Sequence, residues 1–212
     1  MNLPLPTAHP ATFGLVLAGG RGRRMGGADK PLLRLRGATI LERVLSRLVP
    51  QCAGVALNAN GDPTRFAFTG LAVVADDVPG FAGPLAGVLA GLDLLAVRRP
   101  DTQWLVTVPG DCPFLPGDLV ARLHAARERD GTTLACARSG EWTHPVVGLW
   151  PVALRADLRR ALVEEGLAKV GAFAARHGVA LASWPAEPFD PFFNVNTPED
   201  AAEAERMAAL SA

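Results

Sequence analysis

Short apolar runs alternate with longer segments of helical periodicity along the chain. Apolar runs of this length, bounded by turn residues, are typical of buried strands. We expect strands at residues 13–17, 53–59, 71–75, 104–108, 132–138, 145–150 and 179–184. We expect helices at residues 84–97, 116–129, 152–163, 169–177 and 197–210, and another that begins after Thr39. This alternation predicts an α/β fold with a mostly parallel central sheet and helices on both of its faces.

Local signals support the predicted helices. Thr39 is followed three residues later by Glu42, which is the spacing of a capping box. The segment Thr197-Pro-Glu-Asp200 combines an N-cap with proline at the first helical position and acidic residues in the first turn. The predicted helix 84–97 is almost wholly apolar. We therefore expect it to be buried between layers, where small residues such as Gly87 and Gly91 let another element approach closely.

Composition narrows the class of protein. The 212 residues include 21 Lys and Arg against 21 Asp and Glu, and this zero net charge argues against a nucleic-acid or membrane-surface binder. No apolar run approaches the roughly 20 residues that a membrane-spanning helix needs. The three cysteines form no Cys-x-x-Cys pair, which indicates reduced thiols and a cytoplasmic protein. We interpret residues 1–12 as a loose N-terminal arm and residues 13–212 as one domain.

Three polar loops directly follow predicted strands. They are residues 19–30, the segment that begins Asp76-Asp77, and the pair Gly110-Asp111. The carboxyl ends of parallel strands meet at one edge of a sheet, and α/β proteins of this kind bind their ligands there. We therefore expect the three loops to converge on a single site.

The loop 19–30 has the composition of a phosphate-binding loop. Its glycines let backbone N–H groups approach a triphosphate, and Arg24 and Lys30 supply cations to neutralise its charge. Two other phosphate motifs fail, because Met25 stands where a dinucleotide fingerprint needs glycine and Ala28 stands where a P-loop needs lysine. The alternative is a flexible surface loop with solvated arginines. The strand before the loop and Lys30 at its end favour triphosphate binding.

Polar side chains at other strand ends are candidates for metal and nucleotide contacts. Asp111 lies on a proline-stiffened turn and suits Mg²⁺, which prefers one or two protein oxygens beside phosphates and water. Asp76 can accept hydrogen bonds from a base or a sugar, and the amides of Asn58 and Asn60 can read a base edge. The alternatives are ordinary turn chemistry for Asp111 and the two asparagines, and a cap for Asp76.

The later part of the chain adds further candidates. Asn194 and Asn196 stand just before the last predicted helix, whose N-terminus is a natural place for an anion, although simple N-terminal capping is the alternative. His144 is a weaker candidate, because a lone histidine is usually structural or exposed. Cys112 is next to Asp111 but has no histidine nearby in sequence, so we interpret it as a packing residue rather than a nucleophile.

These segments together resemble the molybdenum cofactor guanylyltransferases, the MobA-type enzymes. The resemblance begins with the loop Leu17-Ala-Gly-Gly…Arg24-Met-Gly…Asp29-Lys30. It continues in the same order through Val74-Ala-Asp76, Gly83-Pro-Leu-Ala-Gly87, Gly110-Asp-Cys-Pro113, His144-Pro145 and Asn194-Val-Asn-Thr-Pro-Glu199. It therefore covers the chain from about Phe13 to its end, and it implies a Rossmann-like nucleotidyltransferase fold.

The resemblance implies transfer of GMP from GTP to the molybdopterin cofactor, with release of pyrophosphate and with Mg²⁺ as the cofactor. The implied nucleotide-binding residues are Leu17, Ala18, Gly19, Gly20, Lys30, Asn58, Asp76 and Asp111. The implied catalytic residues are Arg24, Lys30 and Asp111, with Asp111 as the metal ligand, and the implied pterin-side residues are Asn194, Asn196 and His144. Molybdoenzymes or their chaperones are the implied recipients of the product.

Two further functions are compatible with the same loop. A cytidylyltransferase that acts on the same pterin, or a sugar-phosphate nucleotidyltransferase, would differ only in its contacts to the base and the acceptor. Gly20 favours the guanylyl function, because cytidylyl relatives often show an Ala-Ala-Gly order instead. A non-catalytic nucleotide sensor or pterin carrier could dispense with Lys30 or Asp111, and both are present.

Overall fold

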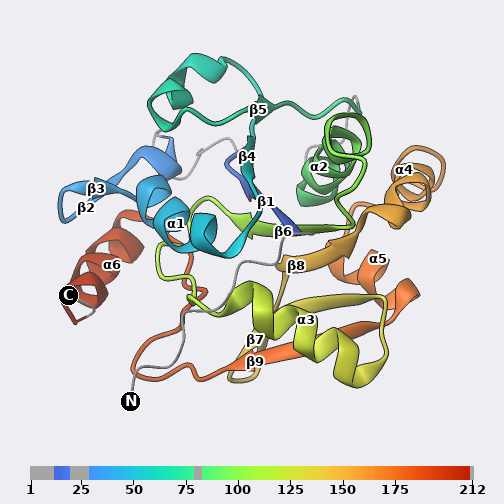
Figure 1. Cartoon of the computed structure of the whole chain (residues 1–212). Helices are drawn as coiled ribbons and strands as arrows, with labels where there is room; N and C mark the ends of the chain where they lie inside the picture. The colour runs from blue at the N-terminus through green and yellow to red at the C-terminus, as the bar shows by residue number, and fades with distance from the viewer. Residues whose placement is uncertain (1–11, 20–28, 79–82, 211–212) are drawn as a thin grey trace.

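A seven-stranded sheet forms the centre of the molecule (Figure 1), in the strand order β5-β4-β1-β6-β8-β7-β9. The computed structural model describes residues 12–19, 29–78 and 83–210. The strands of this sheet are β1 (Thr12–Leu17), β4 (Val55–Asn58), β5 (Val73–Val74), β6 (Trp104–Pro109), β7 (Leu134–Ser139), β8 (Trp142–Pro151) and β9 (Val179–Trp184). A separate two-stranded ribbon pairs β2 (Arg34–Leu35) with β3 (Ala38–Thr39).

The central sheet is mostly parallel, as the sequence predicts. Strands β5, β4, β1 and β6 pair in parallel, and β7 pairs in parallel with β9. Strand β8 runs antiparallel to both of its neighbours, β6 and β7. The antiparallel direction of β8 has a local cause, because a tight turn joins β7 to β8. Gly140 in this turn has a φ of 52°, a left-handed conformation that favours glycine.

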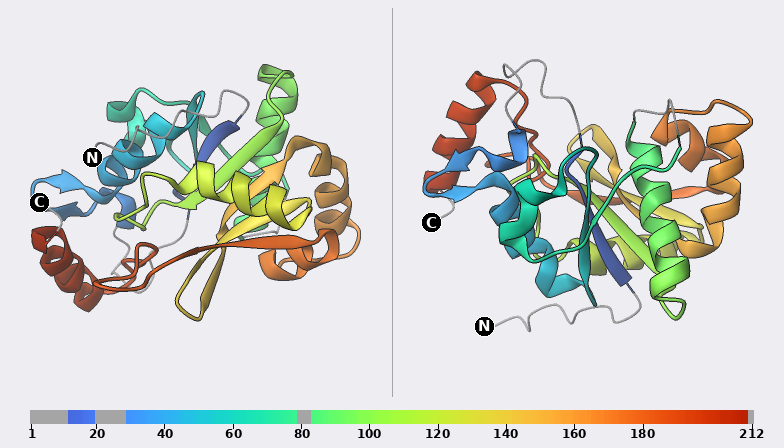
Figure 2. Two further views of the ribbon diagram at one scale, coloured as in Figure 1. Left: turned by 60° about the horizontal axis from the view of Figure 1, so that its bottom comes forward. Right: turned by 90° about the horizontal axis from the view of Figure 1, so that it is seen from above.

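Helices cover both faces of the sheet, which confirms the second part of the predicted fold class (Figures 1 and 2). The helices are α1 (Ile40–Leu48), α2 (Pro84–Arg98), α3 (Leu119–Asp130), α4 (Arg155–Val163), α5 (Val170–His177) and α6 (Pro198–Leu210). The buried side chains of α1, α3 and α6 belong to one hydrophobic cluster, and those of α2, α4 and α5 belong to another. The buried strand residues divide between the two clusters, so the sheet is a middle layer between two cores.

Alternation along β1 shows how the sequence builds this middle layer. Leu15 faces the cluster that contains α2, and Val16 faces the opposite cluster, so both faces of the strand are buried. Helix α2 lies very close to the sheet at Gly91, where an added Cβ would be 2.6 Å from Leu15 Cδ2 and 2.8 Å from Leu105 Cδ2. The predicted close approach at Gly91 is therefore confirmed.

Most predicted elements are present, with shifted ends. The predicted strand at residues 71–75 is only two residues long, and the predicted helix at residues 116–129 begins at Leu119. Short 3-10 helices that the pattern does not predict are η2 (Lys30–Leu32), η3 (Val49–Gln51) and η4 (Pro63–Thr69), while η5 (Val152–Leu154) forms the start of the helix predicted at residues 152–163. The capping box before α1 is formed as expected, with Glu42 Oε2 accepting from Thr39 N at 2.6 Å and Thr39 Oγ1 accepting from Glu42 N at 3.1 Å. In the part of the chain that the structure describes, no helix is long and apolar enough to cross a membrane.

Candidate active site

The carboxyl ends of β5, β4, β1 and β6 meet at one rim of the sheet. Backbone hydrogen bonds continue past the strand ends, from Ala18 N to Asn58 O at 2.9 Å, from Ala59 N to Val74 O at 3.0 Å and from Gly110 N to Leu17 O at 2.9 Å. The predicted convergence of the three polar loops is therefore confirmed for the residues that the structure describes. Gly20 and Arg24 lie outside these residues, so their predicted roles stay predictions.

Lys30, Asp111 and Asn196 meet at the centre of this rim. The ammonium of Lys30 donates to Asn196 Oδ1 at 2.6 Å and lies 4.0 Å from Asp111 Oδ2. The side chains of Lys30 and Asp111 are only 21% and 22% exposed, so solvent screens their attraction only partly. Sequence reasoning places Lys30 and Asp111 together, but it does not anticipate that Asn196 contacts the lysine.

A glycine lets the Asp111 loop lie against the end of β1. A Cβ added at Gly110 would be 3.2 Å from both Ala18 Cα and Leu17 O, and 3.3 Å from the ring of Pro31. A side chain at this position would therefore push the Asp111 loop away from β1. Burial raises the pKa of the Asp111 carboxyl, and the positive charge of Lys30 acts against this rise.

The donor set around Asp111 fits one particular kind of metal site. Among the described residues, no three His, Cys, Asp or Glu side chains gather into a metal-binding group. A cation held by the Asp111 carboxylate has phosphate and water oxygens available as further ligands. This is the coordination that Mg²⁺ prefers in sites that also bind nucleotides.

Asn58, Asn60 and Asp76 form a hydrogen-bonded group beside the end of β4. Asn58 Nδ2 donates to Asp76 Oδ1 at 2.9 Å and to Val74 O at 3.2 Å, and Asn60 Nδ2 donates to Asp76 Oδ2 at 2.8 Å. The Asn58 side chain is also confined by α2, because a Cβ at Gly87 would be only 2.4 Å from Asn58 Oδ1. These contacts fix the predicted nucleotide-binding side chains in place.

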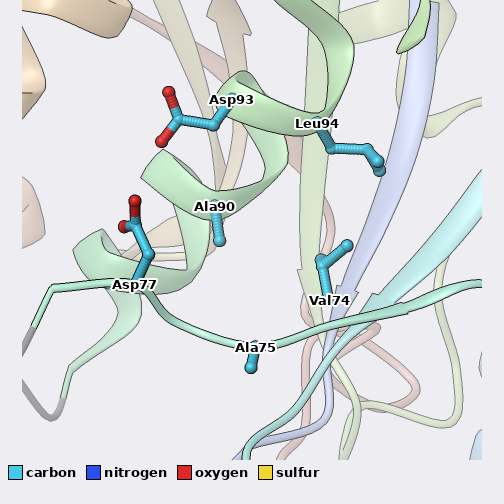
Figure 3. A pocket seen from close by; sticks show the side chains of 6 residues that line it. All are labelled: Val74, Ala75, Asp77, Ala90, Asp93 and Leu94. Carbon is cyan, nitrogen blue, oxygen red and sulfur yellow. The ribbon is translucent and has the colours of Figure 1, made fainter. Parts of the chain in front are cut away.

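The neighbouring carboxylate of Asp77 points elsewhere. It contacts Arg159 at 2.9 Å, and Arg159 also contacts Asp93 of α2 at 2.6 Å. A pocket of about 240 Å³ lies beside these two carboxylates (Figure 3), between α2 and the segment that follows β5. Its lining residues are Val74, Ala75, Asp77, Ala90, Asp93 and Leu94. Because Arg159 already neutralises its charged groups and none of the predicted site residues lines it, we do not assign the nucleotide to this pocket.

Arg65 is a member of the site region that the sequence analysis missed. It lies in η4, and its Nη1 atom donates to Asp29 Oδ1 at 2.7 Å and to Asp29 Oδ2 at 2.9 Å. Its Nη2 atom donates to Asn60 O at 3.0 Å. The sequence carried one signal for this element, since Asp62-Pro-Thr64 has the form of a helix start, but nothing in it paired Arg65 with Asp29.

Cys112 and Asn194 connect the Asp111 loop to the segment before α6. The thiol of Cys112 donates to Asn194 Oδ1 at 2.7 Å, and Val195 N donates to Asp111 O at 3.0 Å. The pKa of the Cys112 thiol is raised well above its usual value by burial and by the nearby carboxylates of Asp111 and Asp190. The thiol is therefore protonated, which agrees with the interpretation of Cys112 as a packing residue rather than a nucleophile.

The backbone at the start of α6 is capped by the protein itself. Asp200 Oδ2 accepts from Asn196 N at 2.8 Å and from Thr197 N at 2.9 Å, and Thr197 Oγ1 accepts from Asp200 N at 3.1 Å. The anion-facing helix terminus expected from the sequence is therefore wrong for these two N–H groups, because a carboxylate of the same helix occupies them. The structure contains the capping alternative at these two N–H groups, and the side-chain amides of Asn194 and Asn196 remain candidate ligands.

His144 lies on β8, on the other side of β6 from the nucleotide-binding candidates. Its Nε2 atom shares a hydrogen bond with Ser139 Oγ at 2.7 Å and lies 3.9 Å from Asp190 Oδ2. Its ring is 4.8 Å from the ring of Phe192, between centroids. Burial lowers the pKa of His144, and the Asp190 carboxylate acts against this. Sequence reasoning named His144 but missed Ser139 and Asp190, since neither stands in a recognisable motif.

Comparison with known proteins gives one consistent family. Residues 14–179 match the model described as a MobA-like NTP transferase domain. A molybdenum cofactor guanylyltransferase of Bradyrhizobium sp. (strain ORS 278) is 62% identical over 210 residues, which cover 99% of this chain and 98% of that protein. The corresponding protein of Rhodopseudomonas palustris (strain BisB5) is 59% identical over 200 residues, covering 94% of this chain and 95% of the relative.

Solved structures show the same fold at low sequence identity. Molybdopterin-guanine dinucleotide biosynthesis protein A from Archaeoglobus fulgidus superposes with a TM-score of 0.70 at 23% identity, covering 93% of this chain and 99% of that one. A Mycobacterium tuberculosis protein solved in complex with manganese has a TM-score of 0.67 at 21% identity, covering 92% and 97%. At these identities the two likenesses describe the fold alone.

Proposed function

The chain belongs to the molybdenum cofactor guanylyltransferase family, and we propose that its rim transfers GMP from GTP to the molybdopterin cofactor with release of pyrophosphate. The observation that carries this proposal is the cluster of Lys30, Asp111 and Asn196, which lies between two groups of residues on the rim. We call the group of Leu17, Asn58 and Asp76 the nucleotide half of the rim. We call the group of Cys112, His144 and Asn194 the acceptor half.

In the nucleotide half, Asn58 and Asp76 hold the nucleoside of GTP, while Leu17, Ala18 and Gly19 supply backbone close to the phosphates. The hydrogen bonds that fix Asn58 support this role, because a pre-organised side chain loses little entropy when a ligand binds. Lys30 neutralises charge on the phosphates from the base of the loop. We propose the same task for Arg24.

Asp111 is the proposed ligand of Mg²⁺. Bound there, the cation supplies Lewis-acid polarisation of the α-phosphate and neutralises charge on the departing pyrophosphate. A carboxylate within 4.0 Å of Lys30 keeps that ammonium in place without consuming its capacity to meet phosphate oxygens. A relative of this fold was solved with manganese, which supports a divalent cation in this class of structure.

The chain's own residues need to do little covalent chemistry. A terminal phosphate oxygen of the pterin forms a bond to the α-phosphorus of GTP while the bond from that phosphorus to the bridging oxygen breaks, and pyrophosphate leaves with the electron pair. The nucleophile is already an anion, so no side chain has to remove a proton. The rim instead aligns the two phosphates in line and neutralises their charge.

The acceptor half is proposed to receive the pterin. Asn194 and Asn196 both have their Oδ1 atoms engaged by protein donors, Cys112 and Lys30, so their amide nitrogens remain to donate to an acceptor-rich ligand. His144 on β8 adds a ring that packs against Phe192, in the segment that carries Asn194. Delivery of the product to molybdoenzymes or their chaperones stays a prediction, as does the cytoplasmic location.

The test is pyrophosphate release by the purified protein with molybdopterin cofactor and Mg²⁺, comparing GTP, CTP and ATP. We expect release with GTP, no more than a trace with the other two, and none after chelation of the divalent cation. Release with CTP instead would move the chain to the cytidylyl alternative. Release with GTP that persists in the chelator would remove Mg²⁺ from the proposal.

A further inference from the structure

Arg65 connects two parts of the nucleotide half that are distant in sequence. It contacts both carboxylate oxygens of Asp29, 36 positions earlier, and also the backbone carbonyl of Asn60. Asp29 directly precedes Lys30, and the side chain of Asn60 holds Asp76. One guanidinium therefore spans the segment that carries the phosphate-binding lysine and the turn that carries the nucleoside contacts.

The pair between Arg65 and Asp29 is held more firmly than an ordinary surface ion pair. The two side chains are 28% and 31% exposed, so solvent screens the pair only partly. The Arg65 guanidinium also lies 4.7 Å from the centroid of the Phe66 ring, and Phe66 is fully buried. The aromatic ring and the two hydrogen-bonded partners restrict the arginine to one position.

The carboxylate of Asp29 is used in an unusual way for its position. Asp29 is the N-cap of η2, yet its side chain accepts no hydrogen bond from that helix. Asp62, at the same position of η4, does cap its helix, with Thr64 N donating to its Oδ1 at 2.9 Å. The turn at Lys30 is instead closed by backbone, with Leu32 N donating to Asp29 O at 2.9 Å. The Asp29 side chain is thus committed to Arg65.

We propose that Arg65 is a positioning residue for nucleotide binding, which fixes Lys30 relative to Asn58 and Asp76 through Asp29 and Asn60. The inference rests on the proposed function, since it assumes that Lys30 meets the phosphates and that Asn58 and Asp76 meet the nucleoside. Arg65 itself touches neither Lys30 nor Asp76. Its effect is to keep Lys30 at a fixed distance from Asn58 and Asp76, so that one bound nucleoside triphosphate contacts all three side chains.

The primary measurement compares Arg65→Gln with the unchanged chain. We expect the KM for GTP to rise about tenfold, the order seen when a partner that orients a binding group is lost. The turnover number and the KM for the pterin should change less than about twofold, because the reacting groups stay in place. Titration calorimetry with a GTP analogue that cannot be cleaved between its α- and β-phosphates should show the same tenfold loss of affinity without any turnover.

Two variants separate positioning from simple destabilisation. Asp29→Asn should lower GTP affinity, and adding Arg65→Gln to it should cost clearly less than the two single losses combined, because both changes break the same contact. Arg159→Gln is the matched control, since Arg159 also bridges two segments through carboxylates but lies outside the proposed site. It should leave the KM for GTP unchanged, and thermal melting should be recorded for every variant.

The possible outcomes distinguish a failure of the Arg65 positioning role from a failure of the proposed function on which it rests. An active chain in which Arg65→Gln leaves the KM for GTP unchanged, or raises the KM for the pterin equally, would overturn the positioning role alone. So would a double variant Asp29→Asn/Arg65→Gln that keeps the melting temperature of the unchanged chain but loses GTP affinity by the full sum of the two single losses. An unchanged chain that neither binds the GTP analogue nor releases pyrophosphate would overturn the proposed function and this inference with it.

Discussion

The nucleotide half of the rim is assembled at the ends of neighbouring parallel strands, whereas the acceptor half combines the end of β6, the antiparallel strand β8 and a loop outside the sheet. The strand ends that carry Leu17 and Asn58 are joined by backbone hydrogen bonds that simply continue the sheet. In the acceptor half, the loop that returns from the end of β9 contacts Cys112 through Asn194 and the His144 ring through Phe192. The backbone of the nucleotide half is therefore set mainly by the sheet, whereas the acceptor half also depends on contacts made by the returning loop.

Removal of the Asp111 carboxylate should affect both halves of the rim alike, because in the proposed mechanism both substrates depend on the cation that Asp111 holds. Asp111→Asn keeps the shape of the side chain and removes its charge. We expect the turnover number to fall by about 100- to 1,000-fold, the range found when one stabilising group in a transition state is lost. Pyrophosphate release at saturating GTP and pterin is the measurement. Asp101→Asn, in the exposed turn before β6, is the control, and a near-normal rate in the Asp111 variant would remove that residue from metal binding.

Lys30→Met should affect both halves less severely. It removes the cation that we propose neutralises the phosphates, and it leaves Asn196 Oδ1 without the donor Lys30. We expect kcat/KM for GTP to fall about 100-fold. Lys169, exposed at the start of α5, gives the control Lys169→Met, which should have no effect. If the two lysine variants lose activity equally, the charge at residue 30 has no special role.

A pair of alanine variants sharpens the comparison. Asn58→Ala should raise the KM for GTP about tenfold and spare the KM for the pterin, while Asn194→Ala should do the reverse. The reason is that each amide contacts only one of the two substrates in the proposed arrangement. Steady-state kinetics with each substrate varied in turn would reveal the split. Variants that raise both KM values together would show that the two halves are not separate sites.

The smallest expected effect concerns pH. Burial lowers the pKa of His144 below the ordinary value of 6.5, and Asp190 opposes that change. The folded chain therefore binds this proton less readily than the unfolded chain, so stability should fall as the pH drops below about 6.5. NMR titration of the His144 ring should give a pKa below 6.5, and Asp190→Asn should lower it further. A pKa that rises in Asp190→Asn would contradict the assignment of the neighbouring charge.

The difference between the two halves also explains how much of the fold and of the site could be predicted from the sequence. The strand before Gly19, the turn at Asp111 and the helix start at Thr39 are local signals, and the structure contains all three. Their convergence followed from the rule that parallel strands present their carboxyl ends together. The nucleotide half was therefore accessible from local patterns and one topological argument.

The missed residues depend on contacts that no local pattern encodes. Arg65 pairs with an aspartate 36 positions earlier, and the polar partners of His144 come from β7 and from the loop after β9. Spacing along the chain cannot reveal such pairs. The capping of α6 could be predicted from the segment Thr197-Pro-Glu-Asp200. The sequence does not show, however, that the Asp200 carboxylate accepts from Asn196 N and Thr197 N and so occupies the place expected for an anion.

The buried thiol of Cys112 also makes the acceptor half chemically observable. A thiol whose pKa is raised this far reacts very slowly with alkylating reagents while the loop is closed. Its rate of labelling therefore depends on how often the segment that carries Asn194 moves away and exposes the sulfur. The rate of Cys112 labelling, read by mass spectrometry in the unmodified chain, would thus report how often the proposed acceptor half opens.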